Sequence, residues 1–351
     1  MMISKDTTPV VRMPLVLAGF GRVGRAFFRL LEEKAEDCRN RYGIELPVVA
    51  VLRSGGGYLS PAGLRAEDVF DGDRPAPASA ETWKEKIRLD GIFRESDRGC
   101  LVECTPTDLE TGGPALAYCR SALRSGWHVA SASKGALVTA FRELRDLAAT
   151  NGSALKFSGA TAAALPTLDT GRFALAGAQI ESIEAILTGT ANFILTRIGE
   201  GLSFEDALEE AREKGIAEPD PSLDIDGGDT SAKLVLIANS VLDLAFSLKD
   251  VPTEGIRRIT SEDIAAARKQ NLELKLIGSC RKDSGGNWRL QTSVRSVDAT
   301  HPLFHVRGTE KGIAYHTDTM GSVVVTGGRS NPRGTAAALL KDILNIRRGI
   351  L

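Results

Sequence analysis

The sequence predicts an α/β protein, with a doubly wound parallel sheet in its first part and an α+β domain in its second. A glycine-rich turn, GFGRVG at 19–24, lies between an apolar strand and an amphipathic helix. Short apolar runs and helical patterns then alternate up to about residue 150, which is typical of a parallel sheet with helices on both faces. After the Asn-Gly pair at 151–152 this alternation ends, and strands and helices follow in irregular order.

In the first part, the periodicity of the side chains predicts each element. Short apolar runs predict buried parallel strands, and apolar residues at helical spacing predict helices. The strands are expected at 10–18, 47–52, 100–104 and 126–130, and the helices at 25–34, 116–125 and from 135 to about 150. Residues 55–80 are rich in Gly, Pro and Asp, and they predict a long loop with one short helix.

In the second part, the periodicity of the side chains predicts strands and helices in a less regular order. Strands are expected at 183–187, 272–280, 288–294 and 323–326, and helices at 204–214, 230–246 and 335–346. Between the first two of these helices lies an acidic loop, residues 218–229, which is dense in helix breakers.

The composition excludes several classes of protein. The chain has 351 residues, of which 42% are hydrophobic and 25% charged, as in folded globular proteins. Its 44 basic and 45 acidic residues give a net charge of −1, which argues against a nucleic-acid partner. No run approaches the roughly 20 apolar residues of a membrane span, and no signal peptide is recognisable. Five cysteines without a CxxC pair predict reduced thiols, a cytoplasmic location and no zinc site.

The turn at 19–24 predicts a dinucleotide site. Gly19 permits the tight turn, Gly21 lets the backbone approach a pyrophosphate, and Gly24 lets the helix pack closely on the strand. Backbone N–H groups at the start of the helix bind the phosphates. The alternative is a structural glycine-rich turn.

The end of the second predicted strand indicates which dinucleotide binds. NAD sites usually carry an acidic residue there, about 20 residues after the glycines. This chain has Arg53 and Ser54, and a cation beside a hydroxyl suits a 2′-phosphate; Arg22 in the turn adds a second charge. We therefore expect NADP, with NAD as the alternative. For the two arginines, the alternative is that they are solvated surface charges.

Two residues four apart on the long helix predict the chemistry. Asp229 and Lys233 share one helix face, and a lysine projecting from an apolar helix into a closed site can deliver a proton to an aldehyde oxygen as hydride reaches the carbon. The alternative is a surface ion pair. Lys134 follows the predicted strand at 126–130, at the sheet edge where ligands bind. A thiol mechanism at Cys104 is disfavoured, because no histidine is placed near it by sequence.

With these residues in hand, the chain resembles the homoserine dehydrogenases over nearly its whole length. GFGRVG matches the family's nucleotide turn, and the stretch AREKGIAEPDPSLDIDGGDTSAKLVLIA at 211–238 matches its catalytic segment without a gap. Further matching segments are ECTPTDLETGGPAL at 103–116, GWHVASASKGAL at 126–137, GTANFILTRI at 189–198 and HPLF at 301–304.

The resemblance implies reversible NAD(P)H-dependent reduction of L-aspartate 4-semialdehyde to L-homoserine. It also implies a Rossmann-type nucleotide-binding domain (1–151), a catalytic domain that forms a homodimer (152–326), and a C-terminal segment (327–351) that returns to the first domain. The catalytic residues implied are Lys233, Lys134 and Asp229, and the substrate-binding residues are Glu218, Asp224, Gly189, Thr190 and Asn192. The cofactor-binding residues are Gly19, Phe20, Gly21, Arg22, Val23, Gly24, Arg53, Ser54, Thr105, Pro106, Ser133, Lys134 and Gly328.

The sequence departs from the family pattern in places. Ser158 stands where the family has a glutamate that helps to bind a monovalent cation, so we expect no metal site. Ser133 replaces an asparagine before Lys134, and the regulatory ACT domain of many relatives is expected to be absent. These departures leave two alternatives open: a related oxidoreductase with a different hydroxy or aldehyde substrate, and a non-catalytic NADP-binding sensor.

Overall fold

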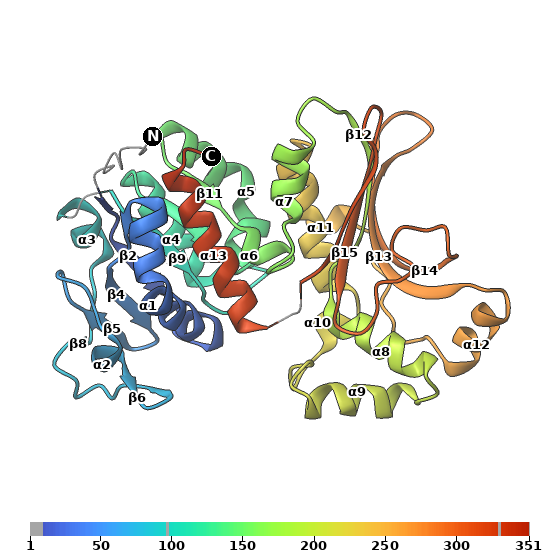
Figure 1. Ribbon diagram of the computed structural model, residues 1–351, viewed down its shortest axis with the longest axis horizontal. Coiled ribbons are helices and arrows are strands. Elements are labelled where there is room, and N and C mark those ends of the chain that lie inside the picture. The colour runs from blue at the N-terminus through green and yellow to red at the C-terminus, as the bar shows by residue number, and fades with distance from the viewer. Residues whose placement is uncertain (1–9, 96–97, 329–330, 351) are drawn as a thin grey trace, which may run out of the picture. The chain divides into compact units, whose positions relative to one another are not determined.

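The computed structural model describes residues 10–95, 98–328 and 331–350, and the chain divides into two units (Figure 1). The first comprises the chain up to Gly159 together with Thr335 onwards, and the second is Ala160–Gly334. These two boundaries lie later in the chain than the ones expected at 151/152 and 326/327. The reason is that β11 (Leu155–Lys156) is still a strand of the first sheet, and that β16 (Gly321–Gly327) is still a strand of the second. Among the described residues, no helix has the length and apolar character that crossing a membrane requires.

A seven-stranded sheet with the order β11-β10-β9-β2-β4-β5-β8 forms the first unit. The strands from β11 to β4 run parallel, whereas β5 and β8 pair antiparallel at one edge. The strand order reverses between β2 and β9, and ligands of such sheets bind at this switch point. The remaining strands of this sheet are β2 (Leu15–Ala18), β4 (Val48–Arg53), β5 (Gly56–Leu59), β8 (Trp83–Lys84), β9 (Cys100–Glu103) and β10 (His128–Ser131).

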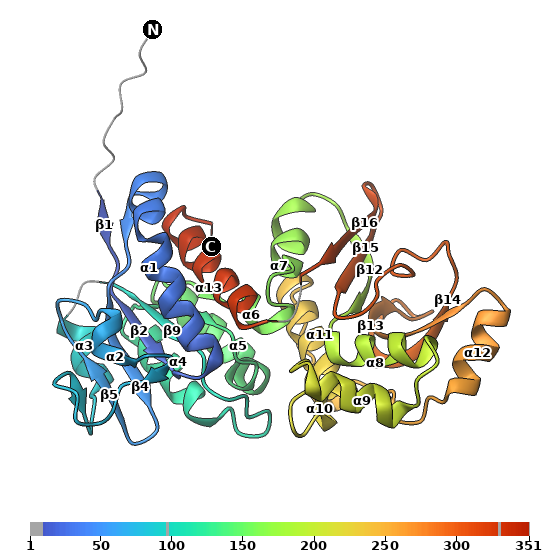
Figure 2. The same cartoon turned by 60° about the horizontal axis from the view of Figure 1, so that its bottom comes forward.

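Helices cover both faces of this sheet, which confirms the predicted doubly wound fold. The connection from β2 to β4 through α1 (Arg22–Tyr42) moves along the sheet in one direction. The connections through α4 (Gly113–Arg124) and α5 (Gly135–Thr150) move in the other, so right-handed crossovers place them on the opposite face. Beside α1 lies α13 (Pro332–Arg347), whose Leu339 and Ile343 share one apolar core with Phe27 of α1 and Leu17 of β2 (Figure 2).

The segment 55–80 was predicted as a loop with one short helix, and that prediction is incomplete. The helix is α2 (Ala66–Val69), but the segment also contains β5 and the short pair β6 (Phe70–Asp71) and β7 (Arg74–Pro75). The glycines that suggested a loop are needed in the strand, because a Cβ on Gly57 would overlap the carbonyl of Val51 in β4. Smaller elements of this unit are β1 (Val11–Arg12), β3 (Ile44–Glu45) and α3 (Leu89–Glu95).

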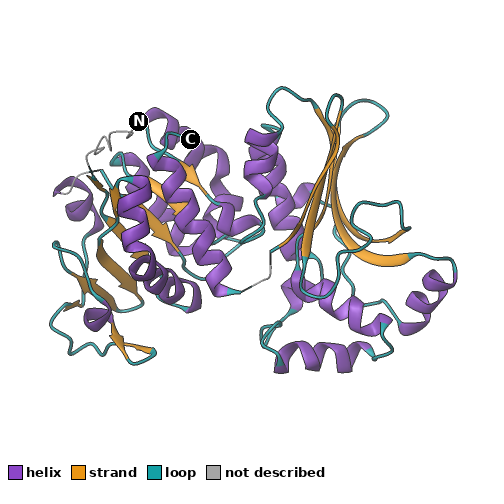
Figure 3. Ribbon diagram, viewed as in Figure 1, coloured by secondary structure: helices purple, strands orange, loops and turns teal. Residues whose placement is uncertain are grey.

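An antiparallel sheet with the order β14-β13-β12-β15-β16 forms the second unit, as an α+β domain requires (Figure 3). Two helices, α8 (Gly189–Gly199) and α11 (Gly228–Val241), pack on it; Gly278 of β13 lies directly against Thr230 and Leu234 of α11. The other strands are β12 (Ile180–Ile186), β13 (Glu273–Lys282), β14 (Trp288–Val297) and β15 (Lys311–Thr317), and the other helices are α6 (Ser158–Thr161), α7 (Thr167–Asp169), α9 (Phe204–Glu213), α10 (Ser222–Ile225) and α12 (Ser261–Lys269).

The long apolar helix ends at Val241, whereas the sequence predicted that it continues to residue 246. The side chain of Asn239 is the physical reason: its Nδ2 donates to Phe246 O (2.8 Å), and its Oδ1 accepts from Phe246 N (2.9 Å). These bonds fold the following residues back on the helix, and Asp243 takes a left-handed conformation with φ 52°. The strand β15 was not predicted, because its sequence KGIAYHT has no clear alternation of polar and apolar residues.

A buried lysine lies in the second sheet. Lys275 of β13 is 2% exposed, and its Nζ donates to Val306 O at 2.6 Å. Burial lowers the pKa of Lys275 to about 8. Since a lysine in an unfolded chain titrates near 10.4, the unfolded state binds more protons than the folded state between about pH 8 and 10.4. This group therefore makes the free energy of unfolding rise with pH across that range.

We expect Lys275→Met to remove this pH dependence. Urea unfolding at pH 7, 8.5 and 10 should show a smaller rise in the free energy of unfolding for the variant than for the wild type. Lys282→Met is the matched control, because Lys282 lies on the same strand but is exposed. Equal slopes for Lys275→Met and the wild type would mean that Lys275 keeps an ordinary affinity for its proton.

Candidate functional site

The glycine turn joins β2 to α1 with the geometry that a phosphate site needs. Gly19 has φ 94°, and a Cβ there would lie 2.5 Å from Cys104 O, so only glycine fits. A Cβ on Gly24 would overlap the carbonyl of Gly19, whereas Gly21 has open space on its side. No side chain caps the start of α1 and its first turn carries no acidic residue. The backbone N–H groups there are therefore suited to bind a pyrophosphate.

The other residues of the turn contribute differently. Phe20 is buried and packs edge-on against Phe28 and Tyr58, so its side chain belongs to the core. Val23 is half-buried, and Arg22 is exposed at the first position of α1. At this turn, the chain offers its backbone and the Arg22 guanidinium to a ligand.

Arg53 ends β4, where a dinucleotide's adenosine ribose binds in such folds. Its Nη1 donates to Tyr58 OH (2.6 Å) and to Ala76 O (3.3 Å), and its guanidinium lies 5.6 Å from the ring centroid of Trp83. These contacts hold a half-buried cation at the strand end, unlike a freely solvated surface charge. Ser54 follows, exposed, in the two-residue turn that pairs Arg53 with Gly56.

The exits of β9 and β10 form the other half of this sheet edge. Thr105 is half-buried and Pro106 exposed after β9, while Ser133 is 3% exposed after β10. The Ser133 and Thr107 hydroxyls lie 3.4 Å apart, which brings the two exits together. Lys134 is half-buried at the start of α5.

In the second unit, Lys233 and Asp229 form a largely buried ion pair at the start of α11. Lys233 Nζ lies 2.5 Å from Asp229 Oδ2 and donates to Leu187 O at 2.9 Å. The side chains are 14% and 7% exposed, so this pair differs from a solvent-exposed surface pair.

A threonine that the sequence analysis missed completes this arrangement. Thr188, at the start of α8, is 4% exposed; its hydroxyl lies 3.2 Å from Asp229 Oδ2 and 2.8 Å from Thr230 Oγ1. A chain of hydrogen bonds thus runs from Thr230 through Thr188 to Asp229 and Lys233. The TGTAN sequence contains the residue, but nothing in the pattern shows that its side chain faces α11.

The residues predicted to bind substrate fall into two groups. Glu218 is exposed on its loop, and Asp224 is half-buried in α10. In contrast, Gly189, Thr190 and Asn192 are buried in the first turn of α8. Thr190 Oγ1 donates to Ile216 O (3.2 Å), and Asn192 Nδ2 donates to Gly308 O (3.0 Å) and Glu310 O (3.2 Å). The two polar side chains therefore hold neighbouring loops in place.

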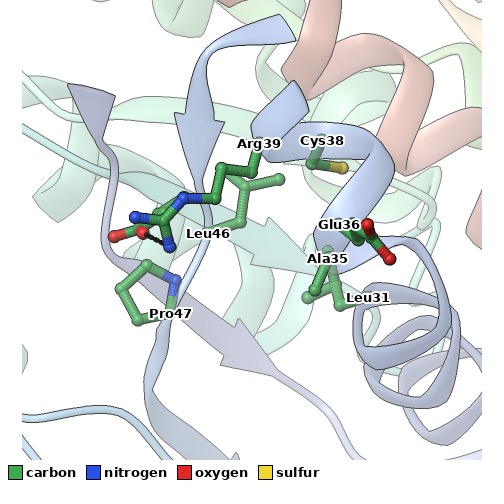
Figure 4. A pocket seen from close by; sticks show the side chains of 8 residues that line it. Leu31, Ala35, Glu36, Cys38, Arg39, Leu46 and Pro47 are labelled. Atoms are coloured by element: carbon green, nitrogen blue, oxygen red, sulfur yellow. Dashed lines mark ion pairs between the residues drawn. The ribbon is translucent and has the colours of Figure 1, made fainter. Parts of the chain in front are cut away.

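Gly328 and the cavity beside α1 belong to different units of the chain. Gly328 follows β16 in the second unit, with φ 67°, and packs against the backbone of Leu165. A cavity of about 490 Å³ lies between α1 and residues 45–47, with an ion pair between Arg39 and Glu45 at its rim (Figure 4). It contains no predicted site residue, and the phosphate-binding end of α1 is the opposite end of that helix.

The comparisons with known proteins point to the same family over almost the full chain. The sequence model for the homoserine dehydrogenase NAD-binding domain matches residues 19–158, and the homoserine dehydrogenase model matches residues 166–344. The homoserine dehydrogenase of Methanocaldococcus jannaschii is 36% identical over 95% of this chain and 98% of its own length. The chain belongs to the homoserine dehydrogenase family. Members of this family are oxidoreductases that act on a CH–OH group with NAD(P).

Another relative and a solved structure are similar to this chain over nearly its whole length. An NAD(+)-dependent homoserine dehydrogenase from Pseudomonas canavaninivorans is 32% identical over 95% of this chain and 96% of its own. The crystal structure of a homoserine dehydrogenase from Thiobacillus denitrificans has a TM-score of 0.81 at 25% identity and covers 97% of this chain and 74% of that chain.

Ser158, which departs from the family's cation-binding pattern, forms hydrogen bonds with other residues of the chain. Ser158 N and Oγ donate to Asp342 Oδ2 and Oδ1, both at 2.8 Å. Lys341 Nζ lies 2.7 Å from Ser158 Oγ and 2.9 Å from Asp342 Oδ1. An ammonium of the protein therefore lies beside the carboxylate. Within residues 10–95, 98–328 and 331–350, no group of three His, Cys, Asp or Glu side chains could hold a metal.

We expect activity and thermal stability to respond little when Na⁺ is exchanged for K⁺ or for tetramethylammonium. The physical reason is that a neutral serine lacks the ligand charge on which hard cations depend, and Lys341 already neutralises Asp342. The assay is run at constant ionic strength, because screening alone alters binding of the cofactor phosphates. A saturable activation by one ion would contradict this expectation.

Proposed function

We propose that this protein catalyses the reversible reduction of L-aspartate 4-semialdehyde to L-homoserine with NADPH. The observation that carries the proposal is the buried Lys233–Asp229 pair, held by Leu187 O and Thr188. An ammonium with two of its three N–H groups bound in place presents the third in a fixed direction. That proton can be delivered to the aldehyde oxygen as the carbon is reduced.

The other assigned residues bind and orient the substrate. Asp229 holds the Lys233 ammonium in one orientation and balances its charge within a buried site. The exposed carboxylate of Glu218 and the half-buried Asp224 are suited to bind the substrate ammonium group. Thr190 and Asn192 hold the backbone at Ile216, Gly308 and Glu310 against α8, so we assign them to positioning the segments around the substrate.

The first unit provides the residues for the cofactor, which supplies the hydride when it is bound. The uncapped start of α1 and the turn at Gly19 and Gly21 fit the pyrophosphate. Thr105, Pro106, Ser133 and Lys134 at the ends of β9 and β10 are assigned to the nicotinamide half, and Lys134 also provides the second lysine of the reaction. We assign NADP over NAD because Arg53 is held at the strand end where NAD sites carry an acid.

The purified protein with L-homoserine and either NADP⁺ or NAD⁺ tests the proposal, by the appearance of reduced nicotinamide. We expect turnover with homoserine and a higher kcat/KM with NADP⁺. Turnover only with another hydroxy amino acid would favour a related oxidoreductase of different substrate range. Binding of NADPH without turnover of any such substrate would favour a sensor.

We also propose a cytoplasmic homodimer. All five cysteines are free thiols, Cys38, Cys100, Cys119 and Cys280 being buried, which suits a reducing compartment. Light scattering on the purified protein measures the mass that distinguishes a dimer from the 37.4 kDa monomer.

A further inference from the structure

A buried carboxylate lies at the centre of the first sheet's carboxyl edge. Glu103 is the last residue of β9 and is 0% exposed. In the sheet register it is aligned with Ala18, which ends β2, and with Ser131, which ends β10. Its position is therefore at the point where the strand order reverses, although the surrounding CLVEC sequence shows only an apolar strand.

The contacts of Glu103 join two segments that leave the sheet separately. Its Oε1 accepts from Thr105 N (2.7 Å) and from Thr105 Oγ1 (2.5 Å), and its Oε2 accepts from Ser131 Oγ (2.7 Å). The Thr105 N–H can only donate, and the Thr105 hydroxyl donates as well, which suits a carboxylate. Ser131 Oγ shares its proton between Glu103 Oε2 and Ser133 O, which lies 3.0 Å away. Burial raises the pKa of Glu103, and the hydrogen bonds from Thr105 and Ser131 oppose that effect.

The glycine turn packs directly against the residues that follow Glu103 in the chain. Cys104 N donates to Ala18 O at 2.7 Å, and a Cβ on Gly19 would lie 2.8 Å from Thr105 N. In doubly wound sheets, a dinucleotide binds across the switch point, with one nucleotide on each side. Because Arg53 at the end of β4 marks the adenosine side, the ends of β9 and β10 take the nicotinamide side.

We propose that Glu103 is a positioning residue for the nicotinamide half of the cofactor: its carboxylate fixes Thr105 and the Ser131–Ser133 turn together and adds a negative charge on that side. This rests on the proposed function, since it requires a nicotinamide dinucleotide. The oxidised nicotinamide ring carries a positive charge and the reduced ring does not. A carboxylate shielded from water near that ring therefore favours the oxidised cofactor.

The test measures binding of NADP⁺ and of NADPH to the full chain without substrate, by calorimetry. For Glu103→Gln we expect the ratio of the NADP⁺ Kd to the NADPH Kd to rise roughly five- to tenfold, the scale of one partly screened charge interaction. Asp342→Asn is the matched control, because Asp342 is also a buried carboxylate of the first unit, 1% exposed. We expect that control to lower the melting temperature but to leave the ratio unchanged.

The outcomes separate the two proposals. If Glu103→Gln lowers the melting temperature and leaves the ratio unchanged, Glu103 has a structural role only and the inference fails. If the wild type binds neither nicotinamide cofactor, the proposed function fails, and this inference with it. Should Glu103→Gln not fold, Ser131→Ala carries the test, because it removes the bond that joins the β10 exit to Glu103. We expect the Kd values for NADP⁺ and NADPH to rise in the folded variant, and unchanged Kd values overturn the inference.

Discussion

Lys233→Ala is expected to lower kcat by about 10²- to 10⁴-fold while leaving the Kd for NADPH nearly unchanged. The variant removes the proposed proton donor, which Asp229 and Leu187 O hold in place and which Thr188 supports through Asp229. It leaves the first unit, which carries the glycine turn and Arg53, without any change. Steady-state kinetics with aspartate semialdehyde and titration with NADPH measure the two quantities separately.

The control for this variant is Lys269→Ala, an exposed lysine at the end of α12. It changes the net charge equally and should keep wild-type kinetics. Because Lys233 is buried against Asp229, its removal takes the ion-pair partner away from a buried carboxylate, so the melting temperature must be measured for both variants. A folded Lys233→Ala protein with near-normal kcat would refute the proton-donor assignment.

Arg53→Asp is expected to reverse the cofactor preference. The new carboxylate repels a 2′-phosphate and can accept hydrogen bonds from the ribose hydroxyls of NAD. A charge-assisted hydrogen bond to a phosphate is worth about 1.5–3 kcal/mol, so the KM for NADP⁺ should rise roughly 10- to 100-fold. The KM for NAD⁺ should fall or stay the same.

A second variant separates the loss of the cation from the gain of the anion. Arg53→Gln removes the charge but can still donate to Tyr58 OH or Ala76 O, the partners of Arg53. It should weaken NADP⁺ binding without improving NAD⁺ binding. Unchanged relative KM values in both variants would show that Arg53 serves only to hold Tyr58 and the loop at Ala76.

Local patterns in the sequence predicted the parts of the fold and site that depend on neighbours along the chain. The strand, glycine turn and helix around Gly19 lie within one continuous segment, and Asp229 and Lys233 meet because they are one helical turn apart. The strand β5 was missed because its glycines are needed for close approach to β4, a contact that no local pattern reveals.

Contacts between distant residues explain the rest of what the sequence could not predict. Ser158 was interpreted only as a missing glutamate, because its partner Asp342 lies 184 positions later in the chain. Likewise, Thr188 contacts Asp229 across 41 positions, and Glu103 contacts Ser131 across 28. Polar residues of this kind acquire their roles from the tertiary fold, whereas apolar periodicity needs only the helix or strand itself.

The position of α13 has a consequence for how the protein is made. Leu339, Ile343 and Ile346 complete the apolar core of the first unit, yet the ribosome adds them only after the whole of the second unit. The second unit, Ala160–Gly334, has its own core and is fully synthesised before them. Domains usually fold in the order in which they emerge. Here the order is inverted: the unit that begins first is completed after the second unit, and the nascent chain exposes part of its apolar core until α13 has been synthesised.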